Sequence, residues 1–265
     1  MDEKYTQSIE EAFKLTSQLI LSNLPKTVLS SLTEEDRVYY QRHPVEFSRN
    51  VLNGDPWDLQ EQVLEALVSE SRVSVRSSHG VGKSWIAGSA LLWFLSCFRP
   101  STVITTAPTG RQVKDILWKE INDQYHKAKR QLGGRILTTQ LLMSETEKWF
   151  ATGFTTDEYD LDRFQGFHNT NIFVVIDEAA GVASNIYNAV EGLLSSGIVV
   201  RLLLIGNPTN EQTNFGKSFK SGIYKKFHVS SLDTPNFTEF GITIEDIRTS
   251  MNVGGEVIGE WKNKI

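Results

Sequence analysis

The sequence lacks the features that mark a secreted or membrane-spanning protein. Cys97 is the only cysteine among 265 residues, which excludes an intramolecular disulfide and a cysteine metal cluster and favours a reducing cytoplasm. No run of apolar residues approaches the roughly 18 to 20 needed to span a bilayer. The first residues, Met1–Tyr5, have neither the basic nor the apolar part of a signal peptide. We therefore expect a soluble protein with no membrane partner.

A strong excess of one charge is also missing. The formal net charge of −5 argues against tight binding of nucleic acid over the whole surface, but it leaves room for a local basic face. Residues 111–135 carry seven Lys or Arg against three acids, and residues 201–228 carry five against one. Either segment fits a contact with a phosphate backbone, and either fits an ordinary solvated face equally well.

The pattern of apolar residues predicts an α/β fold with a parallel-rich central sheet and helices on both faces. Short β-branched runs alternate with helical periodicities, which is typical of βαβ units. Strands are expected at 73–76, 102–107, 136–137, 148–152, 172–176 and 199–205, and helices at 6–24, 58–70, 85–93, 109–128 and 186–194. The helix that starts at Thr109 has a capping-box pattern with Gln112. Its inward-facing residues are expected to be Val113, Ile116, Leu117, Ile121, Tyr125 and Ala128.

Residues 77–84, Ser-Ser-His-Gly-Val-Gly-Lys-Ser, end in the Gly-Lys-Ser of a phosphate-binding loop. Ser77 stands where the usual pattern has its first glycine, but the segment lies between an expected strand and an expected helix, as a P-loop does. In such a loop backbone N–H groups cradle phosphates. Lys83 would reach the β- and γ-phosphates and the hydroxyl of Ser84 would bind Mg²⁺. The nucleotide-binding residues expected here are Ser78, His79, Gly80, Val81, Gly82, Lys83 and Ser84.

A second motif follows the buried strand at 172–176, which ends in Asp177 and Glu178. Sites of open α/β sheets gather at the carboxyl ends of such strands. Asp177 is expected to hold Mg²⁺, directly or through water, and Glu178 to deprotonate the water that attacks the γ-phosphate. With Lys83, Glu178 forms the expected catalytic pair. The two motifs together predict hydrolysis of a nucleoside triphosphate with Mg²⁺ as cofactor.

These motifs, with four others in the same order, resemble the ATPase domain of the large subunit of viral DNA-packaging terminases. The others are Trp57-Asp58-Leu59-Gln60, Thr106-Ala107-Pro108-Thr109, Phe164-Gln165-Gly166 and Ile205-Gly206-Asn207-Pro208-Thr209. The resemblance runs from roughly Trp57 to Pro235. It implies a P-loop NTPase of the additional-strand, catalytic-glutamate type with a helical N-terminal adaptor.

The resemblance also implies individual roles. Gln60 would read the adenine edge, and its alternative role is that of a polar helix-start residue. The 106–109 loop would couple to DNA, or be a simple strand-to-helix turn. Asn207, with Thr209, would sense the γ-phosphate, or form an Asn-Pro turn.

The sequence departs from the family at the position four residues before Lys83, where many terminases have an arginine and this chain has His79. Gln165 likewise stands where some relatives place an arginine. An arginine finger contributes ~10³ to 10⁵ in rate, so another residue is expected to supply one. The candidates are Arg76 and Arg163 within the chain, and Arg111 or Arg201 acting on a neighbouring subunit.

The expected division of the chain is a helical adaptor at 1–56, an ATPase core at 57–235 and a C-terminal linker at 236–265. Large terminases generally continue into a nuclease domain, for which the last thirty residues are too few. We therefore expect no nuclease activity from this chain, which is either an excised domain or one polypeptide of a split protein.

The resemblance implies a motor that uses ATP to translocate double-stranded DNA into a procapsid, in the cytoplasm of a phage-infected host. Its expected partners are the portal protein, the small terminase subunit and further copies of itself in a ring. A superfamily-two-like helicase or remodelling ATPase is the alternative, although no room for a second motor domain exists after Thr209. A nucleotide-gated binding module without turnover is disfavoured by the intact Lys83, Ser84, Asp177 and Glu178.

Overall fold

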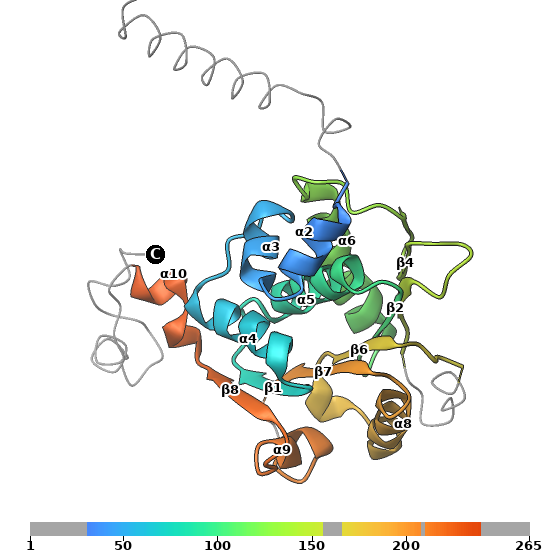
Figure 1. Ribbon diagram of the computed structural model, residues 1–265. Coiled ribbons are helices and arrows are strands. Elements are labelled where there is room, and N and C mark those ends of the chain that lie inside the picture. Colours follow the sequence, from blue (N-terminus) through green and yellow to red (C-terminus); the bar gives the residue numbers. More distant parts are fainter. Residues whose placement is uncertain (1–30, 156–165, 208–209, 240–265) are drawn as a thin grey trace, which may run out of the picture.

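A computed structural model describes residues 31–155, 166–207 and 210–239, which are built around one eight-stranded sheet (Figure 1). The strand order is β3-β4-β5-β2-β6-β7-β1-β8. The six strands from β5 to β8 along this order run parallel, while β3 and β4 extend one edge in antiparallel pairing. The strands are β1 Arg72–Ser77, β2 Ser101–Thr106, β3 Arg135–Ile136, β4 Gln140–Leu142, β5 Phe150–Gly153, β6 Asn171–Ile176, β7 Val199–Gly206 and β8 Lys225–Val229. The expected α/β fold with a parallel-rich sheet is confirmed.

Strand β7 lies between β1 and β6, so one strand separates the strand of the P-loop from the strand of the acidic pair. Val75 of β1 is opposite Ile205 of β7, and Ile176 of β6 is opposite Leu204. This is the additional strand that the fold class requires. Strands β4 and β8 were not expected, because β4 is only three residues long and β8 opens with two lysines.

Helices cover both faces of the sheet, as Figure 1 shows. One face packs against α4 Asp58–Ser69, α5 Lys83–Cys97 and α6 Trp118–Lys127, with α2 Glu34–Tyr40 and α3 Pro44–Asn50 further out. The other face packs against α8 Ser184–Leu194 and α9 Asn214–Ser218. Alternate side chains of each strand divide between two cores, so Val103 faces the α5 side and Ile104 the α8 side.

Helix α5, which starts at the P-loop lysine, is buried along nearly its whole length. Thirteen of its fifteen residues are buried, because the sheet lies on one side and α2, α3 and α6 on the others. Its interior polar groups are paired, and Ser89 hydrogen-bonds to Ser48 of α3. A helix enclosed in this way gives Lys83 a fixed position.

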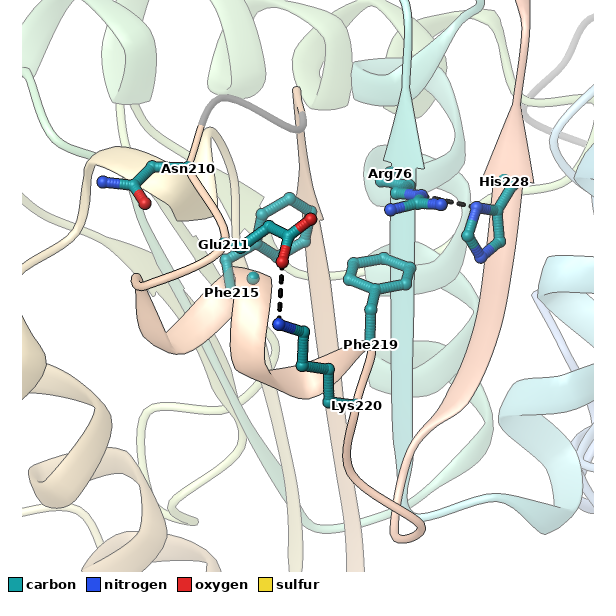
Figure 2. A pocket seen from close by; sticks show the side chains of 8 residues that line it. Arg76, Asn210, Glu211, Phe215, Phe219, Lys220 and His228 are labelled. Carbon is teal, nitrogen blue, oxygen red and sulfur yellow. Dashed lines mark hydrogen bonds and ion pairs between the residues drawn. The ribbon is translucent and has the colours of Figure 1, made fainter.

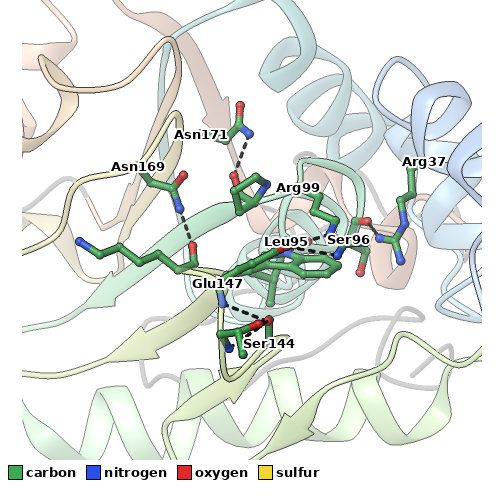
Figure 3. Close-up of polar contacts among 12 residues, drawn as sticks. Arg37, Leu95, Ser96, Arg99, Ser144, Glu147, Asn169 and Asn171 are labelled. Carbon is green, nitrogen blue, oxygen red and sulfur yellow. Dashed lines mark hydrogen bonds and ion pairs between the residues drawn. The ribbon is translucent and has the colours of Figure 1, made fainter.

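Three side chains bind the last carbonyl groups of α5, among them Arg37 at the Ser96 carbonyl, which Figure 3 shows. Trp149 Nε1 donates to the Leu95 carbonyl at 2.8 Å, Arg37 donates to the Ser96 carbonyl, and Gln41 Nε2 donates to the Cys97 carbonyl at 2.9 Å. The Trp149 ring also lies against the guanidinium groups of Arg37 and Arg99, whose Cζ atoms are 5.3 and 5.0 Å from the ring centroid. The cluster satisfies the orphan carbonyls of the helix end and joins α2 to the β5 side of the sheet.

We expect Trp149→Phe to lower the free energy of unfolding by about 1 to 3 kcal/mol, because the buried Leu95 carbonyl loses its donor while a ring remains between the two arginines. Urea unfolding followed by circular dichroism measures the change. Trp57→Phe is the matched control, since Trp57 is half-buried and its indole N–H has no hydrogen bond to the described residues. Equal stability of the two variants would contradict a role of the indole N–H at the helix end.

The helix expected from Thr109 forms, but it opens with a π-helical turn, η2 Gln112–Leu117, before α6. The capping box is present, since Gln112 N donates to Thr109 Oγ1 at 3.3 Å and Thr109 N to Gln112 Oε1 at 3.0 Å. The expectation that Ile116 faces inward is wrong, and its side chain is 42% exposed. The wider π turn shifts the register, so Val113 and Leu117 stay in the core and Trp118 joins them.

The helix expected at 6–24 lies outside the described residues. Helices α2 and α3 lie within the expected adaptor and pack on α5, and the division of the chain into 1–56, 57–235 and 236–265 stays a prediction. None of the helices in the described ranges is long and apolar enough to cross a membrane.

Candidate nucleotide-binding site

The P-loop connects the end of β1 at Ser77 to the start of α5 at Lys83. Gly80 and Gly82 have φ angles of +75° and +81°, which residues with a side chain rarely adopt. A Cβ on Gly82 would also come within 2.5 Å of Gln60 Nε2, so both backbone and space require glycine there. The loop is fixed from the β8 side, because Ser78 N donates to the Val229 carbonyl at 3.1 Å.

Lys83 is the point at which the predicted site residues meet. Its side chain is only 9% exposed, and its ammonium group donates to Asn207 Oδ1 and to the Ser78 carbonyl, the latter at 3.4 Å. Glu178 Oε1 lies 3.7 Å from Lys83 Nζ. The structure thus brings Lys83, Glu178 and Asn207 together from α5, the end of β6 and the end of β7, around the position that a γ-phosphate would take above the P-loop.

The acidic pair stands at the carboxyl end of β6. Asp177 is buried, its backbone N–H donates to the Thr106 carbonyl at 2.9 Å, and its Oδ1 accepts from Glu178 N at 2.9 Å. Glu178 has a φ of +46°, a left-handed conformation that turns its side chain toward Lys83. The backbone of Gly206 comes close to this turn, and a Cβ there would lie 3.0 Å from Ala179 N, a tight contact.

Burial raises the pKa of Asp177 to about 6, and the nearby Glu178 carboxylate acts in the same direction. Since the folded state then binds more protons than the unfolded state between about pH 4 and pH 6, this group stabilises the metal-free fold at low pH. That contribution is lost as the pH rises through about 6. A bound cation requires the ionised form, so low pH opposes its binding.

We expect the Mg²⁺-dependent part of nucleotide affinity to fall as the pH is lowered from about 7 to about 5. Fluorescence titration of a labelled nucleotide with and without Mg²⁺ measures it. In Asp177→Asn the Mg²⁺-dependent part should be small at every pH. The same pH profile in both proteins would show that Asp177 is not the titrating group.

The remaining predicted site residues lie around this centre. Ser84 stands in the first turn of α5, directly after Lys83. Gln60 is buried beside Gly82, and its Oε1 accepts the backbone N–H of Trp57 at 3.2 Å. It therefore serves as a helix-start residue, and its role toward adenine stays a prediction.

His79 has a contact that sequence reasoning missed. The sequence predicts His79 as a nucleotide-binding residue of the loop and does not indicate a partner for its ring, but Nε2 lies 2.6 Å from Asn207 Nδ2. Asn207 therefore contacts both Lys83 and His79, and joins the end of β7 to two positions of the P-loop. No local sequence signal indicates this pair, because 128 residues separate its members.

The candidate arginines occupy different places. Arg201 lies near the amino end of β7, and its guanidinium donates to the Leu67 and Val68 carbonyls at the end of α4. It therefore caps a helix at the amino ends of the strands, while the P-loop lies at their carboxyl ends. Arg111 is exposed directly before η2. Arg76 lies on the α9 side of the sheet. Arg163 lies outside the described residues.

The donor set suits Mg²⁺ with a nucleotide. Among the described residues no group of three or more His, Cys, Asp or Glu could hold a metal ion alone. One carboxylate, Asp177, and one hydroxyl, Ser84, match a Mg²⁺ ion that takes its other ligands from phosphates and water. Two more buried hydroxyls at this edge of the sheet, Ser77 Oγ and Thr106 Oγ1, have no hydrogen-bond partner among the described residues, as expected where a polar ligand sits.

The strand order, with the loop between β1 and α5, is that of the P-loop NTPase fold with an additional strand. No family model matches the chain. A segment of 165 residues is 27% identical to the probable terminase, large subunit, of Enterobacteria phage P7; it covers 59% of this chain and 33% of that protein. The chain thus spans about a third of the curated relative that it matches.

Two solved structures extend this likeness to the fold. The large terminase ATPase domain of Thermus phage P74-26 superposes with a TM-score of 0.57 at 18% identity, over 80% of this chain and 98% of that domain. The large terminase of bacteriophage HK97 superposes with a TM-score of 0.50 at 13% identity, over 75% of this chain and 44% of that one. The resemblance to the ATPase domain of phage large terminases, stated from the motifs, is confirmed.

Proposed function

We propose that the chain is the ATPase motor of viral genome packaging, which couples hydrolysis of Mg²⁺-ATP to translocation of double-stranded DNA. The observation that carries the proposal is the meeting of Lys83, Glu178 and Asn207 at the carboxyl ends of parallel strands, with β7 between the strand of the P-loop and the strand of the acidic pair. The sequence likeness to a phage large terminase subunit supports the choice of this motor among P-loop NTPases.

In this proposal Lys83 neutralises charge on the β- and γ-phosphates, and the backbone N–H groups of residues 78–84 cradle them. Glu178 accepts the proton of the attacking water, and its 3.7 Å separation from Lys83 Nζ supports a position beside the γ-phosphate. Ser84 and Asp177 would hold Mg²⁺, which neutralises phosphate charge when bound. Asn207 would report the presence of the γ-phosphate to the end of β7.

A direct path joins this site to the loop proposed to respond to DNA. The Thr106 carbonyl accepts the Asp177 N–H, and Pro108 packs against the turn after Glu178, where a Cβ on Gly181 would lie 2.9 Å from Pro108 Cγ. The same loop leads through Arg111 into η2, which carries Lys114. A shift of the acidic turn would therefore move the 106–109 loop, which is what coupling requires.

The proposal includes double-stranded DNA, a portal protein, a small terminase subunit and a ring of identical subunits as partners, in the cytoplasm of the infected host. It also includes a division into two domains, in which residues 57–235 form the ATPase core and residues 1–56 form an adaptor. The curated relative is named as a large terminase subunit. The sequence likeness of this chain to one third of that relative supports these assignments.

Steady-state ATP hydrolysis against protein concentration, with and without linear duplex DNA, tests the proposal. A ring motor should gain activity per subunit as concentration rises and again when DNA is added. Strand-displacement activity on a forked substrate should be absent, because translocation along a duplex needs no unwinding. ATP turnover per subunit that does not change with protein concentration or with DNA would contradict the proposed motor function and indicate an ATPase that is not coupled to DNA.

A further inference from the structure

Arg76 comes directly before the P-loop in sequence, but its side chain lies on the opposite face of the sheet from α5. Val73 and Val75 of β1 pack into the core below α4 and α5. Ser74 faces the other way and hydrogen-bonds to Ser218 of α9, with 2.7 Å between the two Oγ atoms. Since side chains alternate along a strand, Arg76 also faces α9, as Figure 2 shows.

The guanidinium of Arg76 is held in place without using its two terminal amino groups. Its Nε donates to His228 Nδ1, and its Cζ lies 5.0 Å from the centroid of the Phe219 ring (Figure 2). Burial and the positive charges of Arg76 and Lys226 lower the pKa of His228, which keeps that ring a neutral acceptor. Among the described residues no hydrogen-bond acceptor contacts the terminal amino groups. A guanidinium oriented in this way offers two parallel N–H donors to an oxyanion.

These donors line a cavity of about 530 Å³ between α9, β1 and β8. Its walls include the aromatic rings of Phe215 and Phe219, and its charged residues are Arg76, Lys220 and Glu211. Glu211 already accepts a hydrogen bond from Lys220 at 2.7 Å, and its pKa is lowered by that bond and, less, by Arg76. The unpaired charge of the cavity is therefore the positive charge of Arg76, which suits an anion of small size.

The cavity adjoins the nucleotide site through a second hollow of about 430 Å³. Arg76 and His228 line both, and the second is also lined by Ser77 and Ser78 of the P-loop and by Asn207. Its one acid, Asp233, accepts the Ser230 N–H at 2.9 Å. Since Asn207 also contacts Lys83, the groups that would surround the γ-phosphate and the Arg76 side chain line adjoining hollows.

We propose that Arg76 is a phosphate-binding residue, which holds the inorganic phosphate released by hydrolysis on its way from the P-loop into the α9 cavity. The proposal rests on the proposed ATPase activity for the source of the phosphate. It assigns Arg76 to a step after bond cleavage and not to the reacting atoms, because its guanidinium lies between Phe219 and His228 on the far face of the sheet.

Calorimetric titration of the Mg²⁺-ADP-saturated protein with inorganic phosphate tests the binding site. Phosphate should bind the native protein, and Arg76→Gln should raise the dissociation constant at least about tenfold. Arg72→Gln is the matched control, since Arg72 lies on the same strand and the same face but pairs with Glu191 at the other end, and it should bind as the native protein does. Arg76→Lys keeps the positive charge but loses the two parallel N–H donors, so its dissociation constant for phosphate should lie between those of the native protein and Arg76→Gln. Unchanged affinity in Arg76→Gln, or competition between ADP and phosphate, would overturn the proposal.

Single-turnover kinetics test whether the bound phosphate comes from ATP hydrolysis. Quenched-flow measurement of ATP cleavage should give the same rate for native protein and Arg76→Gln, while phosphate release, followed with a fluorescent phosphate sensor, should slow severalfold in the variant. A fall in the cleavage rate of ~10³ or more would make Arg76 an arginine finger and overturn the proposal. A native protein that binds phosphate through Arg76 but cleaves no ATP would refute the ATPase function and the source of the phosphate, while the binding site itself would stand on the titration.

Discussion

Glu178→Gln should lower the rate of ATP hydrolysis by about 10² to 10⁴, while ATP still binds. Glutamine keeps the size of the side chain and its position beside Lys83, but it cannot accept a proton from the attacking water. The left-handed backbone at Glu178, with φ of +46°, is compatible with either residue, so the fold should be retained. Steady-state turnover and a separate titration with ATP distinguish loss of chemistry from loss of binding.

Glu145→Gln is the control for this variant, because Glu145 is an exposed acid in the loop between β4 and β5. It should leave turnover unchanged. If Glu178→Gln kept the turnover of the native chain, another group would have to serve as the base and the assignment of the acidic pair would be wrong. If it lost ATP binding as well, Glu178 would be part of the binding site and its catalytic role would lose its support.

Lys83→Ala should lower turnover by about 10² to 10³ and weaken ATP binding, because the variant removes a positive side chain that contacts both Glu178 and Asn207. Turnover and nucleotide affinity of the variant are measured together with its thermal unfolding. The ion-pair partner Glu178 is 31% exposed, so its carboxylate can be hydrated once the ammonium is gone, and an intact fold is expected to accompany the loss of function.

Lys114→Ala provides the comparison for that variant, since Lys114 is exposed on η2 away from the P-loop. It should keep the basal turnover without DNA. A Lys83→Ala protein that bound and hydrolysed ATP normally would refute the P-loop assignment at its centre.

Most of the sheet could be predicted from the sequence, because its central strands are short β-branched runs buried on both faces. The runs at 172–176 and 199–205 lack polar residues at most positions, and each forms a parallel strand of the core. Strand β8 was not predicted, because it lies at the edge of the sheet and only two of its residues, Phe227 and Val229, are buried. Its first two residues are lysines, so the sequence has no apolar run there. The π-helical turn has no periodicity signature, since one extra residue in a helix looks like a slightly displaced apolar pattern.

The candidate site was predictable where one local motif specifies both residue type and backbone shape. The positive φ angles of Gly80 and Gly82 and the position of Asp177 at a strand end follow from such motifs. Contacts between distant segments did not follow, because His79 and Asn207, or Arg76 and His228, meet only when β7 and β8 are in place beside β1. The helix-capping role of Arg201 likewise depends on tertiary packing.

The π-helical turn at Gln112–Leu117 makes this stretch of chain one residue longer than its path requires. A normal α-helical turn would span the same distance with one residue fewer and leave Thr109 and Trp118 facing as they do now. The fold therefore does not fix the chain length at this point, in contrast to the P-loop, where every position is specified. A single-residue deletion that removed Ile116 would take away an exposed apolar side chain and leave the buried ones in register. A change of one residue in chain length is thus expected to be tolerated at the start of the helix that leads away from the nucleotide site.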